Sequence, residues 1–142
     1  MTGRGCVFCE IAAGRTAADV VLEDDASIAF LDHRPLFPGH VLLVPRAHVP
    51  TLLELPDAEV GPLFSNARRI AGALERGLGA QGSFVALNNR VSQSVPHLHV
   101  HVVPRSRGDG LRGFFWPRQR YPDAAEQARV AAAIRGELGR AA

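Results

Sequence analysis

The sequence QSVPHLHVHVV, residues 93–103, places a histidine at every second position from His97 to His101. A β-strand sends successive side chains to opposite faces, so the three imidazoles share one face while the apolar residues between them share the other. An exposed strand face usually carries Thr, Lys, Glu or Ser, because histidines change charge near neutral pH and repel one another once protonated. The pattern therefore indicates a functional strand, whose histidines could bind a metal, act as acid and base, or attack phosphorus.

The chain around this stretch predicts four further strands. Short apolar runs are bounded by Gly, Pro or Asp, which is typical of strands separated by tight turns. Asp24-Asp25 suits the turn of a first hairpin, and Pro38-Gly39 precedes the next strand. Including the histidine strand, which Pro104 stops, we expect strands at residues 20–23, 27–31, 40–44, 84–88 and 98–103.

Three helices are also predicted. Apolar residues recur at helical spacing in a long amphipathic helix that Asp57 would cap and Gly79 would end. A short helix is expected at residues 9–13, ended by Gly14, and a last helix from Asp123 towards Leu138. Strands joined by short turns, with the helices set apart, predict an α+β fold with a mainly antiparallel five-stranded sheet.

The composition narrows the class of protein. The 142 residues, 46% of them hydrophobic, fit one globular domain with a single core. A net charge of +2 suits a small anionic ligand and does not indicate nucleic-acid binding. The chain has no lysine, which excludes lysine-adenylate, Schiff-base and Walker-lysine chemistry. The first apolar run, residues 6–13, is too short to span a membrane, and we expect a cytoplasmic protein.

Residues 97–103 resemble the signature of the histidine triad (HIT) family, in which three histidines alternate with apolar residues. The resemblance extends from Cys6 to about Arg105. It implies a HIT-like fold, which we expect to form one domain over residues 1–142, with a core at about 6–105 and an Arg-rich segment and helix at 106–142.

The resemblance implies that His99, the middle histidine, attacks the α-phosphate of a purine nucleotide and forms a nucleotidyl-histidine that water then hydrolyses. Neutral imidazole is a good nucleophile at pH 7, and two steps avoid direct attack by water on an anionic phosphate. A hydrogen bond from the other ring nitrogen to a backbone carbonyl would point a lone pair at phosphorus. We expect a hydrolase of nucleoside phosphoramidates or dinucleoside polyphosphates.

Three more histidines are candidate catalytic residues through the same resemblance. His101 would stabilise the phosphoryl oxygens or pass a proton to the leaving group. His40 matches an upstream histidine that hydrogen-bonds into the active site in relatives, although a lone histidine at a strand end is often only structural. His97 completes the triad.

Three polar residues match positions that contact phosphate in relatives. Gln93 and Ser94 match a Gln-Ser or Gln-Thr pair that precedes the triad. Asn88 matches an asparagine that contacts the phosphate or the leaving group, and the neighbouring Asn89 leaves the register open. Without the resemblance all of them would be ordinary loop residues.

The nucleoside pocket is expected around the end of the second strand. Asp32 stands where relatives use an acid to accept hydrogen bonds from both ribose hydroxyls, and its alternative role is that of a turn residue. Phe8, Ile11 and Phe30 would form apolar walls around the base. His33 stands where relatives have an aliphatic residue against the purine, so it would stack on the base instead and leaves the base preference open.

Cys6 and Cys9 form a Cys-x-x-Cys pair, a spacing that lets two thiolates bind one tetrahedral zinc ion. In bacterial relatives with this N-terminus the other two ligands correspond to His48 and His97. The resemblance thus implies a structural Cys₂His₂ zinc site, and the alternative is a pair of free or redox-active thiols.

The Arg-rich segment at residues 104–120, with Phe114, Phe115 and Trp116, suits leaving-group recognition, a dimer contact or a solvated loop with a buried aromatic plug. The resemblance also implies a homodimer, and the composition indicates that the protein binds neither nucleic acid nor membranes. Two other functions stay open. A nucleotidyltransferase or phosphorylase is disfavoured by His101, because the transferase branch resembles His-x-His-x-Gln, and a non-catalytic nucleotide-binding interaction protein would retain the fold alone.

Overall fold

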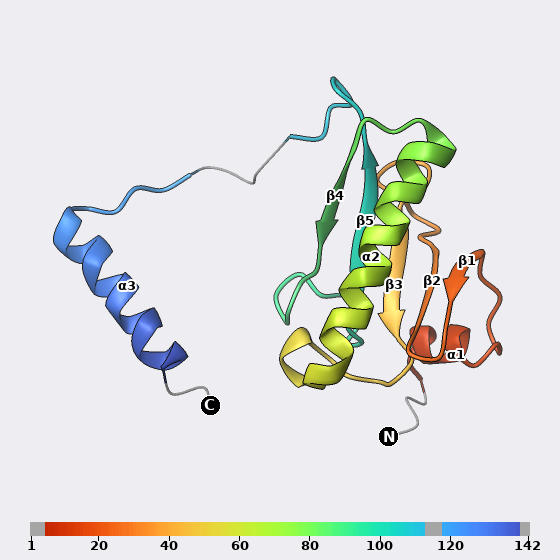
Figure 1. Ribbon diagram of the computed structural model, residues 1–142, viewed down its shortest axis with the longest axis horizontal. Helices are drawn as coiled ribbons and strands as arrows, with labels where there is room; N and C mark the ends of the chain where they lie inside the picture. The colour runs from red at the N-terminus through yellow and green to blue at the C-terminus, as the bar shows by residue number, and fades with distance from the viewer. Residues whose placement is uncertain (1–4, 113–117, 140–142) are drawn as a thin grey trace. The chain divides into compact units, whose positions relative to one another are not determined.

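Five strands form one antiparallel sheet in the order β1-β2-β3-β5-β4 (Figure 1). The structure, a computed structural model, describes residues 5–112 and 118–139. Two compact units divide the chain, Met1–Asp109 and Gly110–Ala142, and the first contains the whole sheet. The strands are β1 Val20–Glu23, β2 Ser27–Leu31, β3 Val41–Pro45, β4 Gly82–Ala86 and β5 Val100–Arg105. The five-stranded antiparallel sheet predicted from the sequence is confirmed, and its strand order is a result of the structure.

Separate apolar clusters cover the two faces of the sheet. On β3, Leu43 packs in the cluster that contains the apolar side of the long helix α2, Asp57–Leu78. Its neighbour Leu42 points the other way, into the cluster that contains Phe8 of the short helix α1, Val7–Ala12. The central strands are therefore buried on both sides, which is why their sequences are almost continuously apolar. Figure 1 shows α2 lying across β3 and β5.

Both helices of the first unit begin in a way that the sequence analysis did not predict. Helix α1 begins at Val7 rather than Cys9, because the Cys6 sulfur caps it by accepting a hydrogen bond from the Cys9 N–H at 3.5 Å. Helix α2 has Pro56 as its N-cap, without a side-chain hydrogen bond. Asp57, expected as the cap, is instead the first helical residue, where its charge faces the positive end of the helix dipole.

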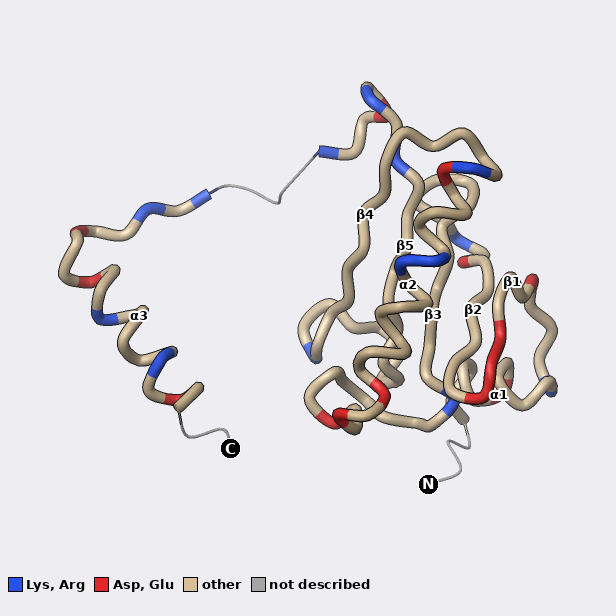
Figure 2. The backbone as a smooth tube through the Cα atoms, in the orientation of Figure 1, with Lys and Arg blue, Asp and Glu red and all other residues tan. Residues whose placement is uncertain are grey.

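The remaining helices are short or lie in the second unit. A 3₁₀ turn, η1, covers Leu52–Glu54. Helix α3, Ala124–Leu138, begins as expected, because the Asp123 carboxylate accepts a hydrogen bond from the Glu126 N–H at 2.8 Å. None of the helices in the described residues is both long and apolar enough to cross a bilayer. Figure 2 shows basic and acidic residues interspersed along the chain in both units.

Strand β5 begins at Val100, two residues later than expected, so only His101 of the three histidines belongs to it. The backbone just before it has other partners, since the Leu98 N–H donates to the Val49 carbonyl at 2.8 Å instead of joining the sheet. The strand also runs through Pro104, which was expected to stop it. Beyond Val102 it pairs with β4 alone, so the missing N–H of proline breaks no hydrogen bond to β3. Strand β4 is displaced in the opposite direction, because it covers residues 82–86 and so begins two residues earlier than the expected 84–88.

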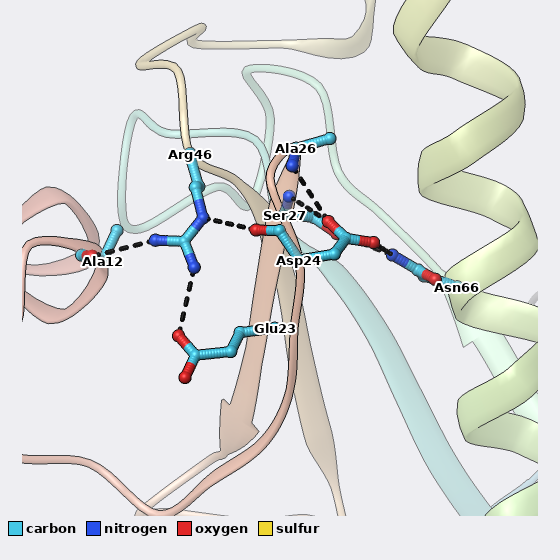
Figure 3. Close-up of polar contacts among 7 residues, drawn as sticks. All are labelled: Ala12, Glu23, Asp24, Ala26, Ser27, Arg46 and Asn66. Carbon is cyan, nitrogen blue, oxygen red and sulfur yellow. Dashed lines mark hydrogen bonds and ion pairs between the residues drawn. The ribbon is translucent and has the colours of Figure 1, made fainter.

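The β1–β2 turn is held by a buried residue of α2. The Asp24 carboxylate accepts hydrogen bonds from the Ala26 and Ser27 N–H groups at 2.9 and 2.8 Å, which forms the tight turn predicted at Asp24-Asp25. The Asn66 amide donates to Asp24 Oδ2 and Ser27 Oγ, both at 2.8 Å (Figure 3). These hydrogen bonds, that from Asn66 first, lower the pKa of the Asp24 carboxyl.

On the other side of the same turn, Arg46 joins three segments. Its guanidinium donates to the Asp24 carbonyl at 2.6 Å, to the Ala12 carbonyl at 3.1 Å and to the Glu23 carboxylate at 3.1 Å (Figure 3). Ala12 is the last residue of α1, so this arginine ties the C-terminal end of α1 to the first hairpin.

Replacing Asn66 by alanine should lower the free energy of unfolding by about 1–3 kcal/mol, because two buried or half-buried acceptors lose their donor. The pKa of Asp24 should rise towards its ordinary value in the same variant. Urea unfolding and an NMR titration of Asp24 would measure both. Ser65→Ala, an exposed change on the same helix, is the control, and equal stability of the two variants would contradict the prediction.

Candidate active site

A pocket of about 670 Å³ opens beside α1 and the ends of β2 and β5. It gathers residues that are distant in the sequence: α1 and the loop behind it, the segment after β2, and the histidine stretch. Eight of the residues predicted for the site line it, namely Phe8, Ile11, Phe30, Asp32, His33, Ser94, His99 and His101. The structure therefore brings His99 and His101 together with the residues predicted for the nucleoside pocket.

The sequence analysis missed the loop at residues 16–19, which follows α1 and lines the same pocket. Arg34, a cation at the pocket wall, was also missed. Neither belongs to a motif, and their positions depend on how the chain passes from α1 to β1 and from β2 to β3. The only sequence signal was their proximity to Ile11 and Asp32.

His99 is held in one orientation. Its Nδ1–H donates to the His97 carbonyl at 2.8 Å, as the sequence analysis anticipated for the nucleophile. The side chain is 7% exposed, and the Phe8 ring meets it edge-on with centroids 5.1 Å apart. Because Nδ1 carries the proton, the lone pair of the neutral ring is on Nε2. His99 can therefore act as a nucleophile from a ring that is fixed before substrate arrives.

His101 lies next to His99, with ring centroids 5.0 Å apart, and makes a hydrogen bond on its far side. Its Nδ1 is 2.9 Å from Nε2 of His40, and the Asp32 carboxylate is 3.8 Å from the same Nε2. Burial, then the neighbouring His99 and His40, lowers the pKa of His101 to about 4, and burial also lowers that of His40. Both rings are neutral at pH 7.

His40 is the last residue of a tight turn at Phe37–His40. The turn is closed by the His40 N–H, which donates to the Phe37 carbonyl at 3.0 Å. Pro38 and Gly39 occupy its centre, and Gly39 has φ of 100°, the left-handed value that the third position of a type II turn requires. A Cβ added to Gly39 would come within 2.5 Å of the Leu78 side chain. The turn thus fixes His40 at the entrance to β3.

Four predicted site residues lie outside the pocket lining among the described residues. His40 lies behind the lining, where its Nε2 is close to both His101 Nδ1 and the Asp32 carboxylate, and His97 faces away from the pocket. The Gln93 side chain is engaged by its own loop, because it donates to the Pro50 carbonyl at 2.6 Å and accepts from the Arg90 N–H at 2.8 Å. Asn88 donates to the Ser92 carbonyl at 3.2 Å. In this arrangement Asn88 and Gln93 shape the loop that presents Ser94.

The four predicted metal ligands meet on the other side of His97. One ligand atom from each of Cys6, Cys9, His48 and His97 lies within 4.8 Å of the others. The Cys9 sulfur is 3.2 Å from His48 Nδ1, and both sulfurs are 3.4 Å from His97 Nδ1. His97 Nε2–H donates to the Pro45 carbonyl at 2.8 Å, which leaves the Nδ1 lone pair directed at the sulfurs.

The chemistry of this cluster fits a metal ion. Burial, then the hydrogen bond and charge of Cys6, raises the pKa of the Cys9 thiol to about 11, as expected where two thiols share a space without a cation. Two sulfurs and two imidazole nitrogens are the donor set of structural zinc sites, and four protein ligands leave no open position. These four residues could hold a metal ion.

The family model for the HIT domain matches residues 13–108. The chain belongs to the HIT family. The uncharacterized HIT-like protein MJ0866 of Methanocaldococcus jannaschii is 40% identical over 107 residues, 74% of this chain and 82% of that protein. The family assignment made from residues 97–103 is thereby confirmed.

Two HIT relatives carry names that state an activity. Adenylylsulfatase HINT3 of Arabidopsis thaliana is 35% identical over 108 residues, 75% of this chain and 55% of that protein. The asymmetrical bis(5'-nucleosyl)-tetraphosphatase of Schizosaccharomyces pombe is 38% identical over 85 residues, 58% of this chain and 47% of that protein. This chain spans about half the length of each.

Solved structures of HIT proteins share the fold. SMU.412c from Streptococcus mutans matches with a TM-score of 0.85 at 36% identity, covering 94% of this chain and 85% of that one. A zinc-bound histidine triad family protein from Mycobacterium smegmatis matches with a TM-score of 0.73 at 36% identity, covering 99% of both chains. A HIT protein of similar sequence therefore binds zinc.

The lowered pKa of His101 predicts how stability depends on pH. The unfolded chain takes up a proton near the ordinary pKa of 6.5, whereas the folded chain does so only near 4, so the free energy of unfolding should fall as the pH drops between these values. His101→Gln should make that decline shallower in urea unfolding measured across the window. His33→Gln, which changes an exposed histidine, should follow the wild type, and identical slopes for all three proteins would contradict the assignment.

Proposed function

We propose that this chain is a nucleotidyl hydrolase that cleaves at the α-phosphate of purine nucleoside phosphoramidates or dinucleoside polyphosphates. The observation that carries the proposal is the hydrogen bond from His99 Nδ1–H to the His97 carbonyl. It leaves Nε2 as the ring nitrogen that can present a lone pair at a pocket of about 670 Å³. A buried imidazole held in this way is suited to nucleophilic attack, and a purely structural histidine would have no need of the pocket.

The reaction has two displacements. In the first, His99 Nε2 forms a bond to the α-phosphorus while the bond from phosphorus to the leaving group breaks. The His101 ring, neutral and adjacent, donates a hydrogen bond to the leaving group or to a phosphoryl oxygen and so stabilises the charge that develops there. In the second, water attacks the phosphorus, the bond to His99 breaks, and a nucleoside monophosphate leaves. A phosphate leaving group departs as an anion and needs no proton, whereas the amine of a phosphoramidate takes up a proton from solvent as it leaves. The attacking water returns one proton to solvent in the second displacement.

The nucleoside would be bound by the other end of the pocket. Asp32 can accept hydrogen bonds from both ribose hydroxyls. Phe8, Ile11 and Phe30 offer an apolar slot for a purine, and the exposed His33 ring can stack on its outer face. Ser94 lines the pocket at the start of the histidine stretch, within the region where phosphate must lie if His99 is to reach it.

The named activities of the relatives support hydrolysis over the two alternatives. Adenylylsulfatase and bis(5'-nucleosyl)-tetraphosphatase both act on a nucleotide joined to a second acidic group. A nucleotidyltransferase of the same superfamily remains the second candidate, because the first displacement is shared and only the acceptor differs. A non-catalytic nucleotide-binding protein would not need the fixed tautomer of His99.

Purified protein should hydrolyse adenosine 5'-phosphoramidate or diadenosine tetraphosphate to AMP, and His99→Ala should reduce kcat/KM by at least about 10³-fold. Mass spectrometry of base-quenched wild type should find AMP attached to His99, and acid should release it because the P–N bond is acid-labile. Ser65→Ala, an exposed change on α2 away from the pocket, should keep the adduct.

AMP binding without turnover of either substrate would favour the non-catalytic alternative. Release of AMP at an undiminished rate by H99A would eliminate the covalent route. Transfer of the nucleotide to an added phosphate, faster than to water, would favour the transferase.

We also propose that Cys6, Cys9, His48 and His97 hold one structural zinc ion. The zinc ion would supply a cross-link of tetrahedral geometry and no catalytic position. It would join α1 to the segments around β3 and β5, and so support the wall that carries Phe8. A reducing cytoplasm would keep both thiols available to bind zinc, and we propose that the protein is cytoplasmic. We also propose that it forms a homodimer.

Protein purified with zinc present should contain about one zinc ion per chain by elemental analysis. Cys9→Ser and His48→Gln should each lose it and melt at a lower temperature, because α1 loses an attachment to the sheet. His33→Gln is the control that should keep the ion. Full zinc occupancy in both ligand variants would rule out this site.

A further inference from the structure

On its side away from the pocket, His101 is connected to the backbone by a chain of two hydrogen bonds. The Leu36 N–H donates to His40 Nδ1 at 3.0 Å. His40 Nε2 lies 2.9 Å from His101 Nδ1. The proposed chemistry of His99 uses neither Leu36 nor the first of these contacts.

A backbone N–H can only donate, and this fixes which atoms carry protons. His40 Nδ1 must present a lone pair to Leu36, so the neutral His40 ring has its proton on Nε2. That proton points at His101 Nδ1, which must then accept it. The neutral His101 ring consequently has its own proton on Nε2, the nitrogen that the His40 contact leaves for the pocket.

We infer that the backbone N–H of Leu36 is a positioning group that sets the tautomers of His40 and His101, so that His101 presents an N–H donor, and never a lone pair, to the pocket. The assignment of tautomers stands by itself, whereas its catalytic consequence rests on the proposed hydrolase function. In that function His101 assists departure of the leaving group and cannot compete with His99 as a nucleophile.

Burial makes the arrangement hard to reverse. His40 is 3% exposed, and no water-facing alternative is available to a nitrogen that would lose its partner. Moving the His40 proton to Nδ1 would set its Nδ1–H against the Leu36 N–H, so that two donors face each other. Protonating both rings would put two N–H groups between His40 and His101, in line with the lowered pKa of each.

The same tautomers decide between two clusters that both have the composition of a metal site. Asp32, His40 and His101 place three possible ligand atoms within 4.8 Å of one another, as the cysteine cluster does. A metal ion needs a lone pair from each imidazole. In His40, however, the Nδ1 lone pair accepts a hydrogen bond from the Leu36 N–H, and the Nε2–H donates a hydrogen bond to His101. At the cysteine cluster, Pro45 takes the proton of His97 and leaves the lone pair free. The chain thus admits a metal at one cluster and excludes it from the other.

The test removes the N–H of Leu36 and keeps the histidines. Leu36→Pro deletes the donor, and Leu36→Ala is the matched control, since the Leu36 side chain is 54% exposed and the alanine variant retains the N–H. Where proline disturbs the segment, a backbone ester at residue 36, made by incorporating the α-hydroxy analogue of leucine, removes the N–H alone. Histidine tautomers would be read from long-range ¹H–¹⁵N correlations of the imidazole rings.

Wild type and L36A should show His40 and His101 entirely as Nε2–H tautomers, and L36P or the ester should show a mixture at both rings. In zinc titrations, only the variants without the N–H should gain a second, weaker site. An unchanged tautomer pattern in both variants that lack the N–H would overturn the inference, as would an Nδ1–H tautomer of His101 in wild type.

The catalytic consequence has its own readout. L36P or the ester should lower kcat roughly 100-fold, within the range expected for loss of a positioned proton donor, while KM changes little. L36A should match wild type. Tautomers as stated in a protein that turns over neither substrate would leave the assignment standing and reject the proposed hydrolase function instead.

Discussion

His97 is the residue on which the site depends, because three of its polar groups serve three different purposes. Its Nδ1 faces the two cysteine sulfurs, its Nε2–H donates to Pro45 at the end of β3, and its carbonyl accepts a hydrogen bond from the His99 Nδ1–H. A single fully buried residue therefore connects the candidate metal cluster, the central strand and the candidate nucleophile. Buried polar groups stay fixed only when all their partners are in place, so each connection constrains the other two.

The two faces of the sheet are covered by different helices. Helix α2 packs on one face with the larger apolar cluster, while the smaller α1 lies on the face that carries the pocket. Contacts of Arg46 with the Ala12 carbonyl and with the first hairpin secure the end of α1 that has no cysteine. Both ends of this short helix are thus held by side-chain chemistry, which a six-residue helix needs because its own hydrogen bonds are few.

The sequence predicted most of the fold, because its elements depend on local patterns, whereas most of the predicted pocket residues came from the resemblance to the HIT family. Apolar runs indicated the five strands, and the spacing of the histidines indicated the candidate catalytic stretch, although the strand itself begins only at Val100. What the sequence could not predict were partners brought in from elsewhere, such as Val49 for the Leu98 N–H and Leu36 for His40. Gln93 shows the same limit, since its side chain is occupied by Pro50 and Arg90 rather than directed into the pocket.

Gly39 shows how one backbone position limits the residues that this part of the structure can accept. Its left-handed backbone sets the direction in which His40 enters β3, and the space where a side chain would stand is taken by Leu78 of α2. A side chain there would strain the turn, because φ lies in the left-handed region, and it would meet the end of the Leu78 side chain. Substitution at this position therefore carries two costs together, one in the backbone of the turn and one in the packing of α2.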